Sequence, residues 1–294
     1  MKLAYYPGCT MHEKAHAFEA SGLRVFEILG FEMARMKEWY CCGAVTSLVS
    51  DNLMNFAAPF RNLALAEKEF PGGTLTTFCA ACYNVLKNTQ SLVSGNGEKK
   101  KILEDFVEEK YSGGVKVLHY LELLRDAENL KEKVKVSLKG LKVAPYYGCL
   151  LLRPYREAGI DDPENPSIME DLISSTGAEA VIFPHRIECC GAHLSVTGPE
   201  QAVSCVKRVI DSARNAGADF IVNSCPLCQY NLDKLQKDMA GGNGEFVPLP
   251  VLYMTEMLAI ALGEDPAAVL SGSHYIDPFP ALAKFKNTPG GGGA

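Results

Sequence analysis

The stretch EWYCCG covers residues 38–43, and its end returns as ECCG at residues 188–191. Each copy places two cysteines side by side, with a glycine directly after them. Working outward from each pair, a single cysteine comes before it and a C-x-x-C motif comes after it. The order single, pair, C-x-x-C therefore occurs twice. The ten cysteines are Cys9, Cys41, Cys42, Cys79, Cys82, Cys149, Cys189, Cys190, Cys225 and Cys228.

The spacing of the two sets predicts an internal duplication. Between the single cysteine and the pair lie 31 residues in the first set and 39 in the second, and between the pair and the C-x-x-C motif lie 36 and 34. The surroundings also match, because YYPGC at 5–9 resembles YYGC at 146–149. VLHYLELL at 117–124 likewise resembles VLYMTEML at 251–258. Self-similarity over such a length indicates two copies of one folding unit.

The fold expected for each copy is α/β. We expect two similar cysteine-rich halves, 1–135 and 136–294, related by pseudo-twofold symmetry. Apolar runs typical of buried strands lie at 3–6, 75–78, 142–147, 180–183 and 219–222, and helical periodicity covers 13–29, 52–70, 83–93, 199–216 and 227–239. Strands that alternate with helices favour parallel sheets. Each cysteine group then follows a strand, where open α/β sheets bind ligands.

Composition narrows the class of protein. The chain has 294 residues, 47% of them hydrophobic, and a formal net charge of −6, which argues against a nucleic-acid partner because such proteins need a basic surface. The longest apolar stretches, such as 257–263, are too short to span a bilayer, and the first residues lack the apolar core of a signal peptide. We therefore expect a cytoplasmic protein. Because disulfides are rare in the cytosol, eleven cysteines indicate metal or redox chemistry.

Five thiols in each half exceed what one zinc ion needs. Thiolates suit zinc and iron-sulfur clusters, but a structural zinc site is complete with four ligands. Two adjacent cysteines point their side chains in different directions, which suits a cluster of several metals. Gly43 and Gly191, after the pairs, would let the backbone approach the inorganic core closely. A zinc-stabilised interaction module remains an alternative at this point.

The complete pattern, C-x(31–39)-C-C-x(34–36)-C-x-x-C occurring twice over nearly the whole chain, resembles the cysteine-rich CCG-domain family, and within it the B subunit of heterodisulfide reductase. The resemblance implies that the five cysteines of each half hold a noncubane [4Fe-4S] cluster. It implies reduction of a disulfide, of the kind formed by coenzyme M and coenzyme B, by two one-electron steps at these clusters. The implied partners are a ferredoxin-like subunit and a flavin-containing subunit of the same complex.

Two positions differ from what is typical of methanogen members of that family. The first pair is followed by Gly43 and Ala44 rather than proline and alanine, and the first C-x-x-C motif contains Ala80 and Ala81 rather than asparagine and glycine. The alternative is therefore an electron-transfer subunit of a bacterial electron-bifurcating or confurcating complex, for example one associated with aromatic-ring reduction, which serves a different acceptor.

A few other residues are candidates for the site. His193, two residues after Gly191, could donate a proton to a leaving thiolate, and a purely structural hydrogen bond is the alternative. Arg153, Arg156 and Arg186 could bind an anionic substrate group, because a guanidinium binds oxyanions through two hydrogen bonds; surface solvation or an ion pair is the alternative for each. Cys205 breaks the repeat, and we expect it to be a buried free thiol.

Overall fold

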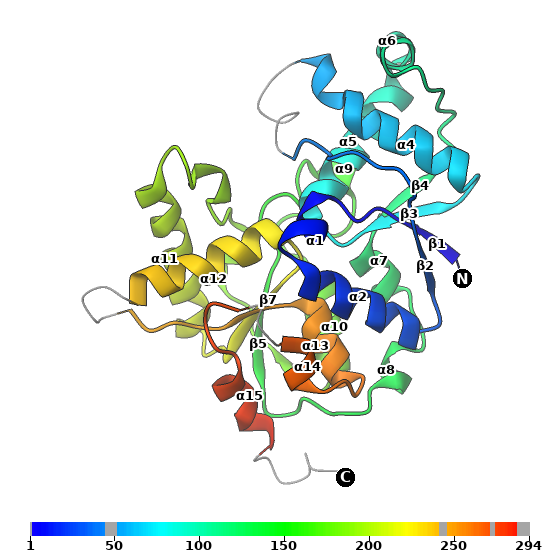
Figure 1. Ribbon diagram of the computed structural model, residues 1–294. Coiled ribbons are helices and arrows are strands. Elements are labelled where there is room, and N and C mark those ends of the chain that lie inside the picture. Colours follow the sequence, from blue (N-terminus) through cyan, green and yellow to red (C-terminus); the bar gives the residue numbers. More distant parts are fainter. Residues whose placement is uncertain (1, 45–51, 241–245, 271–273, 287–294) are drawn as a thin grey trace.

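Two parallel sheets form the framework of the protein. The computed structural model describes residues 2–44, 52–240, 246–270 and 274–286 (Figure 1). The first sheet has the order β2-β1-β3-β4 and the second the order β6-β5-β7-β8, and every pairing is parallel. The strands are β1 (Lys2–Tyr5), β2 (Glu32–Arg35), β3 (Thr74–Thr77), β4 (Lys116–His119), β5 (Lys142–Tyr146), β6 (Glu179–Ala180), β7 (Phe220–Asn223) and β8 (Val251–Tyr253). The predicted fold class is confirmed.

Helices lie between consecutive strands in both halves. In the first half they are α1 (Cys9–Glu13), α2 (His16–Ile28), η1 (Leu53–Phe56), α4 (Ala57–Glu69), α5 (Ala80–Gly95), α6 (Gly97–Val107), α7 (Tyr120–Arg125) and α8 (Leu130–Lys133). In the second half they are α9 (Tyr155–Ala158), α10 (Ile168–Ser175), η2 (Pro184–Ile187), η3 (Ala192–Leu194), α11 (Pro199–Asn215), α12 (Pro226–Ala240), α13 (Met254–Ala261), α14 (Pro266–Leu270) and α15 (Phe279–Lys286).

Four of the five strands expected from apolar runs are present, whereas β6 shares only residue 180 with the run expected at 180–183. Three further strands were not expected. β2 was missed because both of its end residues are exposed, so it lacks a continuous apolar run. β4 and β8 were missed because a helix begins at the residue after each strand. A glutamate in the first turn makes this abrupt change possible: Glu122 accepts a hydrogen bond from His119 N at 2.7 Å, and Glu256 accepts one from Tyr253 N at 2.8 Å.

Strand order brings the cysteines together. In the first sheet β1 lies between β2 and β3, and in the second sheet β5 lies between β6 and β7. The chain therefore adds its second strand on one side of the first strand and its third strand on the other side, which reverses the direction in which the sheet grows. Such a reversal leaves a crevice at the carboxyl ends of the strands. The single cysteine, the pair and the C-x-x-C motif follow the first, second and third strands of each half. All three groups therefore meet at this crevice.

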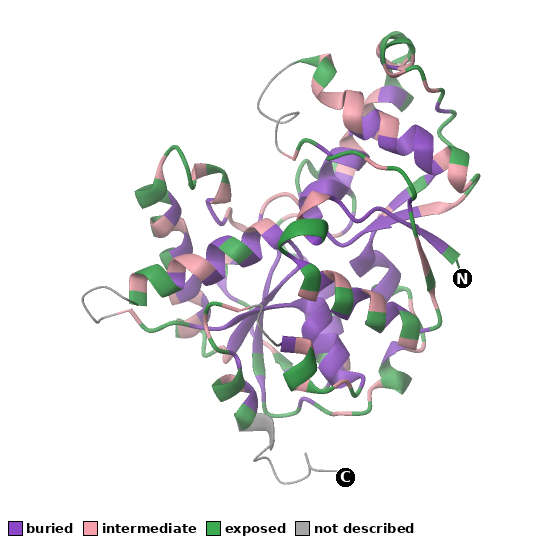
Figure 2. Cartoon of the chain, viewed as in Figure 1, coloured by how far each residue is buried: buried purple, intermediate pink, exposed green. Residues whose placement is uncertain are grey.

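The two halves pack through equivalent helices. α2 of the first half lies against α13, and α10 of the second half lies against α7 (Figure 1). Every residue of α13 is buried, as Figure 2 shows. At this interface the rings of Phe18 and Tyr253 stack with 4.0 Å between centroids, and the hydroxyls of Ser21 and Thr255 lie 2.7 Å apart. The interface is part of the hydrophobic core rather than a hinge.

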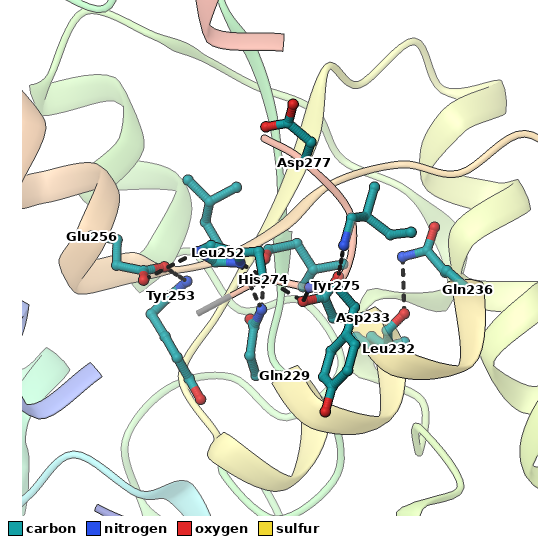
Figure 3. Close-up of polar contacts among 12 residues, drawn as sticks. Gln229, Leu232, Asp233, Gln236, Leu252, Tyr253, Glu256, His274, Tyr275 and Asp277 are labelled. Atoms are coloured by element: carbon teal, nitrogen blue, oxygen red, sulfur yellow. Dashed lines mark hydrogen bonds and ion pairs between the residues drawn. The ribbon is translucent and has the colours of Figure 1, made fainter. Parts of the chain in front are cut away.

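His274, whose side chain is buried, holds the segment that begins there against α12 and α13 (Figure 3). His274 Nε2 lies 3.2 Å from Glu256 Oε1, and His274 Nδ1 lies 3.8 Å from Asp233 Oδ2 and 3.4 Å from Gln229 Nε2. Burial alone would lower the pKa of His274, but the hydrogen bond to Glu256 and the charges of Glu256 and Asp233 outweigh it, so that the pKa is raised. The imidazolium is therefore favoured in the folded protein.

We expect His274 to make stability depend on pH. A raised pKa in the folded state stabilises the protein fully below the ordinary value near 6.5, and this contribution is lost as the pH rises through the raised pKa. Urea unfolding at about pH 6 and about pH 9 should show a larger fall in stability for the wild type than for His274→Gln. An equal fall in both proteins would contradict this assignment.

Candidate functional site

In the first half, the double cysteine connects the other two groups. Cys41 Sγ lies 3.6 Å from Cys9 Sγ, whereas Cys42 Sγ lies 3.4 Å from Cys82 Sγ. The two adjacent thiols thus point toward cysteines that follow different strands, as the sequence predicts. Cys79 is the residue that precedes α5 and is hydrogen-bonded to Cys82. Cys41 is exposed, whereas Cys42, Cys79 and Cys82 are buried.

The second half repeats this arrangement. Cys189 and Cys149 lie close enough to shift each other's pKa, and so do Cys190 and Cys228. Cys225 and Cys228 act on each other in the same way, which closes the set. The five thiols of each half therefore form one continuous group.

The two groups meet at the interface between the halves. The thiols of Cys79 and Cys225 lie close enough for each to shift the pKa of the other, and beside them Ala80 N donates a hydrogen bond to Ser224 O at 3.3 Å. Both cysteines lie at the start of equivalent helices, α5 and α12. The ten cysteines consequently form a single chain of thiols that runs from Cys9 to Cys149.

Neighbouring thiols shift each other's ionisation. Hydrogen bonds from Cys41 and then Cys82 lower the pKa of Cys42 to about 4. Hydrogen bonds from Cys149 and Cys190 lower the pKa of Cys189 to about 2, and the charge of His193 acts in the same direction. One thiol of each pair is therefore favoured as a thiolate, the form of cysteine that binds metals.

All five thiols of the second half line one cavity of about 310 Å³. Ala44 and Ala80 of the first half and Leu150, Ala192 and Leu227 of the second complete much of its wall. Among the described residues, no three His, Cys, Asp or Glu side chains are arranged to hold a single metal ion. A spread set of five soft donors around a cavity fits a cluster of several metals. The assignment of these cysteines as ligands remains a prediction.

Glycines keep room beside the thiols. A Cβ on Gly8 would lie 2.9 Å from Cys82 Sγ, and a Cβ on Gly148 would lie 3.3 Å from Cys228 Sγ. Both glycines have a positive φ, of 73° and 66°. Larger residues would push against the C-x-x-C motif and strain the backbone. The sequence carries this signal, because glycine precedes the single cysteine in both halves, although the predicted site did not include these two residues.

His193 lies at the second cysteine set. Its Nδ1 is 3.7 Å from Cys189 Sγ, and the residue lines the same cavity as the thiols. Ala44 N and Gly191 N each lie 3.4 Å from a cysteine sulfur, of Cys42 and Cys189 respectively. The segment after each pair thus offers hydrogen-bond donors to the site.

The three arginines lie elsewhere. Arg153 Nη1 donates to Ile187 O at 3.0 Å, and the Arg156 guanidinium carbon lies 5.8 Å from the centre of the Tyr155 ring. Arg186 is buried, with Nε 3.3 Å from Glu170 Oε1. None of the three is among the described residues that line the cysteine cavity. Their predicted role toward a substrate anion remains untested.

Cys205 packs beside the second pair. A Cβ on Gly191 would lie 3.0 Å from Cys205 Cβ, and Arg208 Nη2 lies 3.8 Å from Cys205 Sγ. The thiol is free, as expected, but the residue is only partly buried, because α11 places it at the edge of its contact with η3.

Comparisons with known proteins agree with this geometry. The chain is 33% identical over 280 residues, 94% of its length and 96% of the relative's, to the 8-methylmenaquinol:fumarate reductase membrane anchor subunit of Wolinella succinogenes. It is 29% identical over 97% of both chains to the B subunit of the ferredoxin/F(420)H(2)-dependent CoB-CoM heterodisulfide reductase of Methanosarcina acetivorans. In the described part of this chain, no helix is long and apolar enough to cross a membrane.

A solved structure of a hypothetical protein from Helicobacter pylori shares the fold, with a TM-score of 0.76 at 15% identity, over 93% of this chain and 51% of that one. The model of the cysteine-rich domain CCG matches residues 3–87 and again residues 143–233, the two segments that carry the cysteine sets. The chain belongs to the cysteine-rich CCG-domain family.

Proposed function

We propose that this protein is an iron-sulfur electron-transfer subunit that reduces a disulfide. Each set of five cysteines would hold one noncubane [4Fe-4S] cluster. The proximity of Cys79 and Cys225 carries the proposal: the hydrogen bond from Ala80 N to Ser224 O joins the residues next to them, and each thiol shifts the pKa of the other, so the two sets lie side by side at the interface of the halves. Relatives named as B subunits of heterodisulfide reductases, over nearly the full length of both chains, support it.

Reduction of a disulfide takes two electrons and two protons, breaks one S–S bond and yields two thiols. When bound, two clusters supply the electrons one at a time. The protein's own residues exclude water and handle protons. Alanine and leucine side chains line much of the cysteine cavity, and His193, at its wall, could hold a proton for the departing thiolate.

As partners we propose a ferredoxin-like subunit and a flavin-containing subunit of a heterodisulfide reductase-like complex. The chain itself has no ferredoxin-type run of four closely spaced cysteines, so electrons must reach it from another protein of the complex. We also propose a cytoplasmic location, since eleven cysteines without a disulfide are typical of reducing surroundings.

A second candidate is an electron relay to a different acceptor. The Wolinella succinogenes relative is named as a subunit of a menaquinol:fumarate reductase, not of a heterodisulfide reductase. This observation supports a different electron acceptor, and as the alternative we propose an electron-transfer subunit of a bacterial electron-bifurcating or confurcating complex. A relay would keep both clusters and reduce no disulfide itself.

Iron content and turnover of anaerobically purified protein test the proposal. We expect about eight irons and as many acid-labile sulfides per chain, a paramagnetic signal on adding thiol to the oxidised protein, and reduction of 2-hydroxyethyl disulfide with a reduced viologen as donor. Eight irons without turnover would favour the relay. One or two zinc ions without iron would contradict both candidates.

A further inference from the structure

One tyrosine of each half lies beside its cysteine set. Tyr6 and Tyr146 each stand three residues before the single cysteine of their half. Tyr6 directly follows β1, and Tyr146 is the last residue of β5, so both lie at the carboxyl end of a first strand. Both residues are buried, with exposed fractions of 0% and 1%. The two halves therefore bury a phenol at equivalent places next to the site.

Each tyrosine ring packs against the glycine that precedes the single cysteine. A Cβ on Gly8 would lie 3.5 Å from Tyr6 Cε1, and a Cβ on Gly148 would lie 3.5 Å from Tyr146 Cε1. The same Cβ positions lie beside the second thiol of each C-x-x-C motif. In both halves, the ring and this thiol thus flank one glycine.

The two tyrosine hydroxyls donate equivalent hydrogen bonds. The Tyr6 hydroxyl donates to Tyr40 O at 2.7 Å, and the Tyr146 hydroxyl donates to Glu188 O at 2.7 Å. Tyr40 and Glu188 are the residues directly before the two cysteine pairs. Each hydroxyl therefore ties the start of a pair to the strand that leads to the single cysteine.

The carbonyl before a pair influences where its thiols point. This carbonyl belongs to the same planar peptide group as the N–H of the pair's first cysteine. A hydrogen bond to its oxygen therefore limits rotation of the peptide group, and with it the direction of the side chains that follow. In the first half these directions are fixed by two contacts, Cys41 Sγ to Cys9 Sγ at 3.6 Å and Cys42 Sγ to Cys82 Sγ at 3.4 Å.

The two pairs differ in how much support this carbonyl has. Asn62, fully buried on α4, accepts a hydrogen bond from Tyr40 N at 2.7 Å and donates one to Tyr40 O at 2.8 Å. The first pair is thus held by Tyr6 and Asn62 together. In the second half, the Tyr146 hydroxyl is the one side-chain donor to the carbonyl before the pair, among the residues that the structure describes. The second pair should therefore depend more strongly on its tyrosine.

We propose that Tyr6 and Tyr146 are positioning residues for the two cysteine pairs. By holding the carbonyl before each pair, each phenol sets the adjacent thiols in the diverging directions in which they can bind different metals of one cluster. The purpose of this positioning rests on the proposed cluster sites. The positioning itself concerns the protein's own thiols, so it can be measured with no metal bound.

Labelling of the buried thiols tests the positioning in reduced protein stripped of metal. Cys42 and Cys190 are the buried members of the two pairs. In Tyr146→Phe, we expect iodoacetamide to label Cys190 about tenfold faster than in the wild type, the factor expected for one lost hydrogen bond, with no change at Cys42. In Tyr6→Phe, where Asn62 remains, labelling of Cys42 should rise about threefold and labelling of Cys190 should stay unchanged. Unchanged labelling of Cys190 in Tyr146→Phe would overturn the proposal.

Tyr111→Phe is the matched control. Tyr111 is also buried, its hydroxyl accepts a hydrogen bond from Gln90 Nε2 at 2.9 Å, and its ring packs edge-on against Phe60. Its loss should lower stability in urea without a selective change at either cysteine pair. A role in stability alone would speed labelling in both halves together, because global opening exposes every thiol. Equal increases at Cys42 and Cys190 in Tyr146→Phe would therefore also overturn the proposal.

Iron release separates this inference from the proposed clusters. In protein that holds both clusters, a chelator should remove about four of about eight irons from Tyr146→Phe about tenfold faster than from the wild type, and the other four at the wild-type rate. If the protein binds no iron but labelling of Cys190 responds as expected, the positioning stands and the cluster proposal fails. If iron is bound and this labelling is unchanged, the clusters stand and the positioning role is wrong.

Discussion

Replacing Cys42 by alanine is expected to remove the iron of the first half and to leave most of the iron of the second. Cys42 is the link in its set, because its thiol contacts Cys82 while its neighbour Cys41 contacts Cys9. Without the Cys42 thiol, the cysteine pair no longer connects Cys9, which follows β1, with Cys82, which follows β3. Iron per chain should fall from about eight to about four, and Cys190→Ala should have the mirror effect in the second half.

Cys205→Ala is the control for these variants. It removes a thiol that packs beside Gly191 but lies outside the chain of ten thiols, so the iron content should stay at the wild-type level. Iron and acid-labile sulfide are measured on each variant after anaerobic purification. An unchanged iron content in Cys42→Ala would show that the ligands are assigned wrongly.

The second large effect is expected at the interface between the halves. Phe18 is fully buried, stacks on Tyr253, and has the rings of Phe78 and Tyr120 within 5.8 Å of its own. Phe18→Ala should leave a cavity there and lower the free energy of unfolding by about 3–5 kcal/mol. Urea unfolding of the metal-free protein gives this value.

Phe106→Ala is the matched control, because the Phe106 residue on α6 is 62% exposed. We expect it to change the free energy of unfolding by no more than about 0.5 kcal/mol. If both alanine variants lost the same small amount, α2 and α13 would not form part of the core, and the two halves would have to be regarded as separately packed domains.

The cysteine pattern predicted much of the site because it needed only the order of the strands. In a parallel sheet, residues that follow neighbouring strands meet at one edge, so the cysteines after the predicted strands were expected to converge. β2, which precedes the first cysteine pair, was not among those strands. Local geometry alone also predicted that the two adjacent cysteines point their side chains in different directions. What the sequence could not show was that the two sets touch, since this contact depends on how α2 and α13 pack.

The sequence could not predict features that form between segments far apart in the chain. Arg186 was a candidate for anion binding, but its partner Glu170 comes from α10 and became visible only in the structure. Hydrogen bonds from Tyr275 N and Ile276 N to Asp233 bring the segment at His274 back to α12, a contact that no local pattern signals. β8 was hidden for a different reason, because its apolar residues run without interruption into those of α13.

The hydrogen bond from Ala80 N to Ser224 O bears on the symmetry of the duplication. Perfect twofold symmetry would require a second bond, from the residue at position 226 to Phe78 O. Position 226 is a proline, which has no N–H to donate, and Phe78 O instead lies 3.2 Å from His119 Nε2. Two copies of the first half would carry alanine at both positions and could form both bonds, whereas two copies of the second half could form neither. A symmetric pair of first halves could therefore form both bonds across the interface, and the present chain forms one of them.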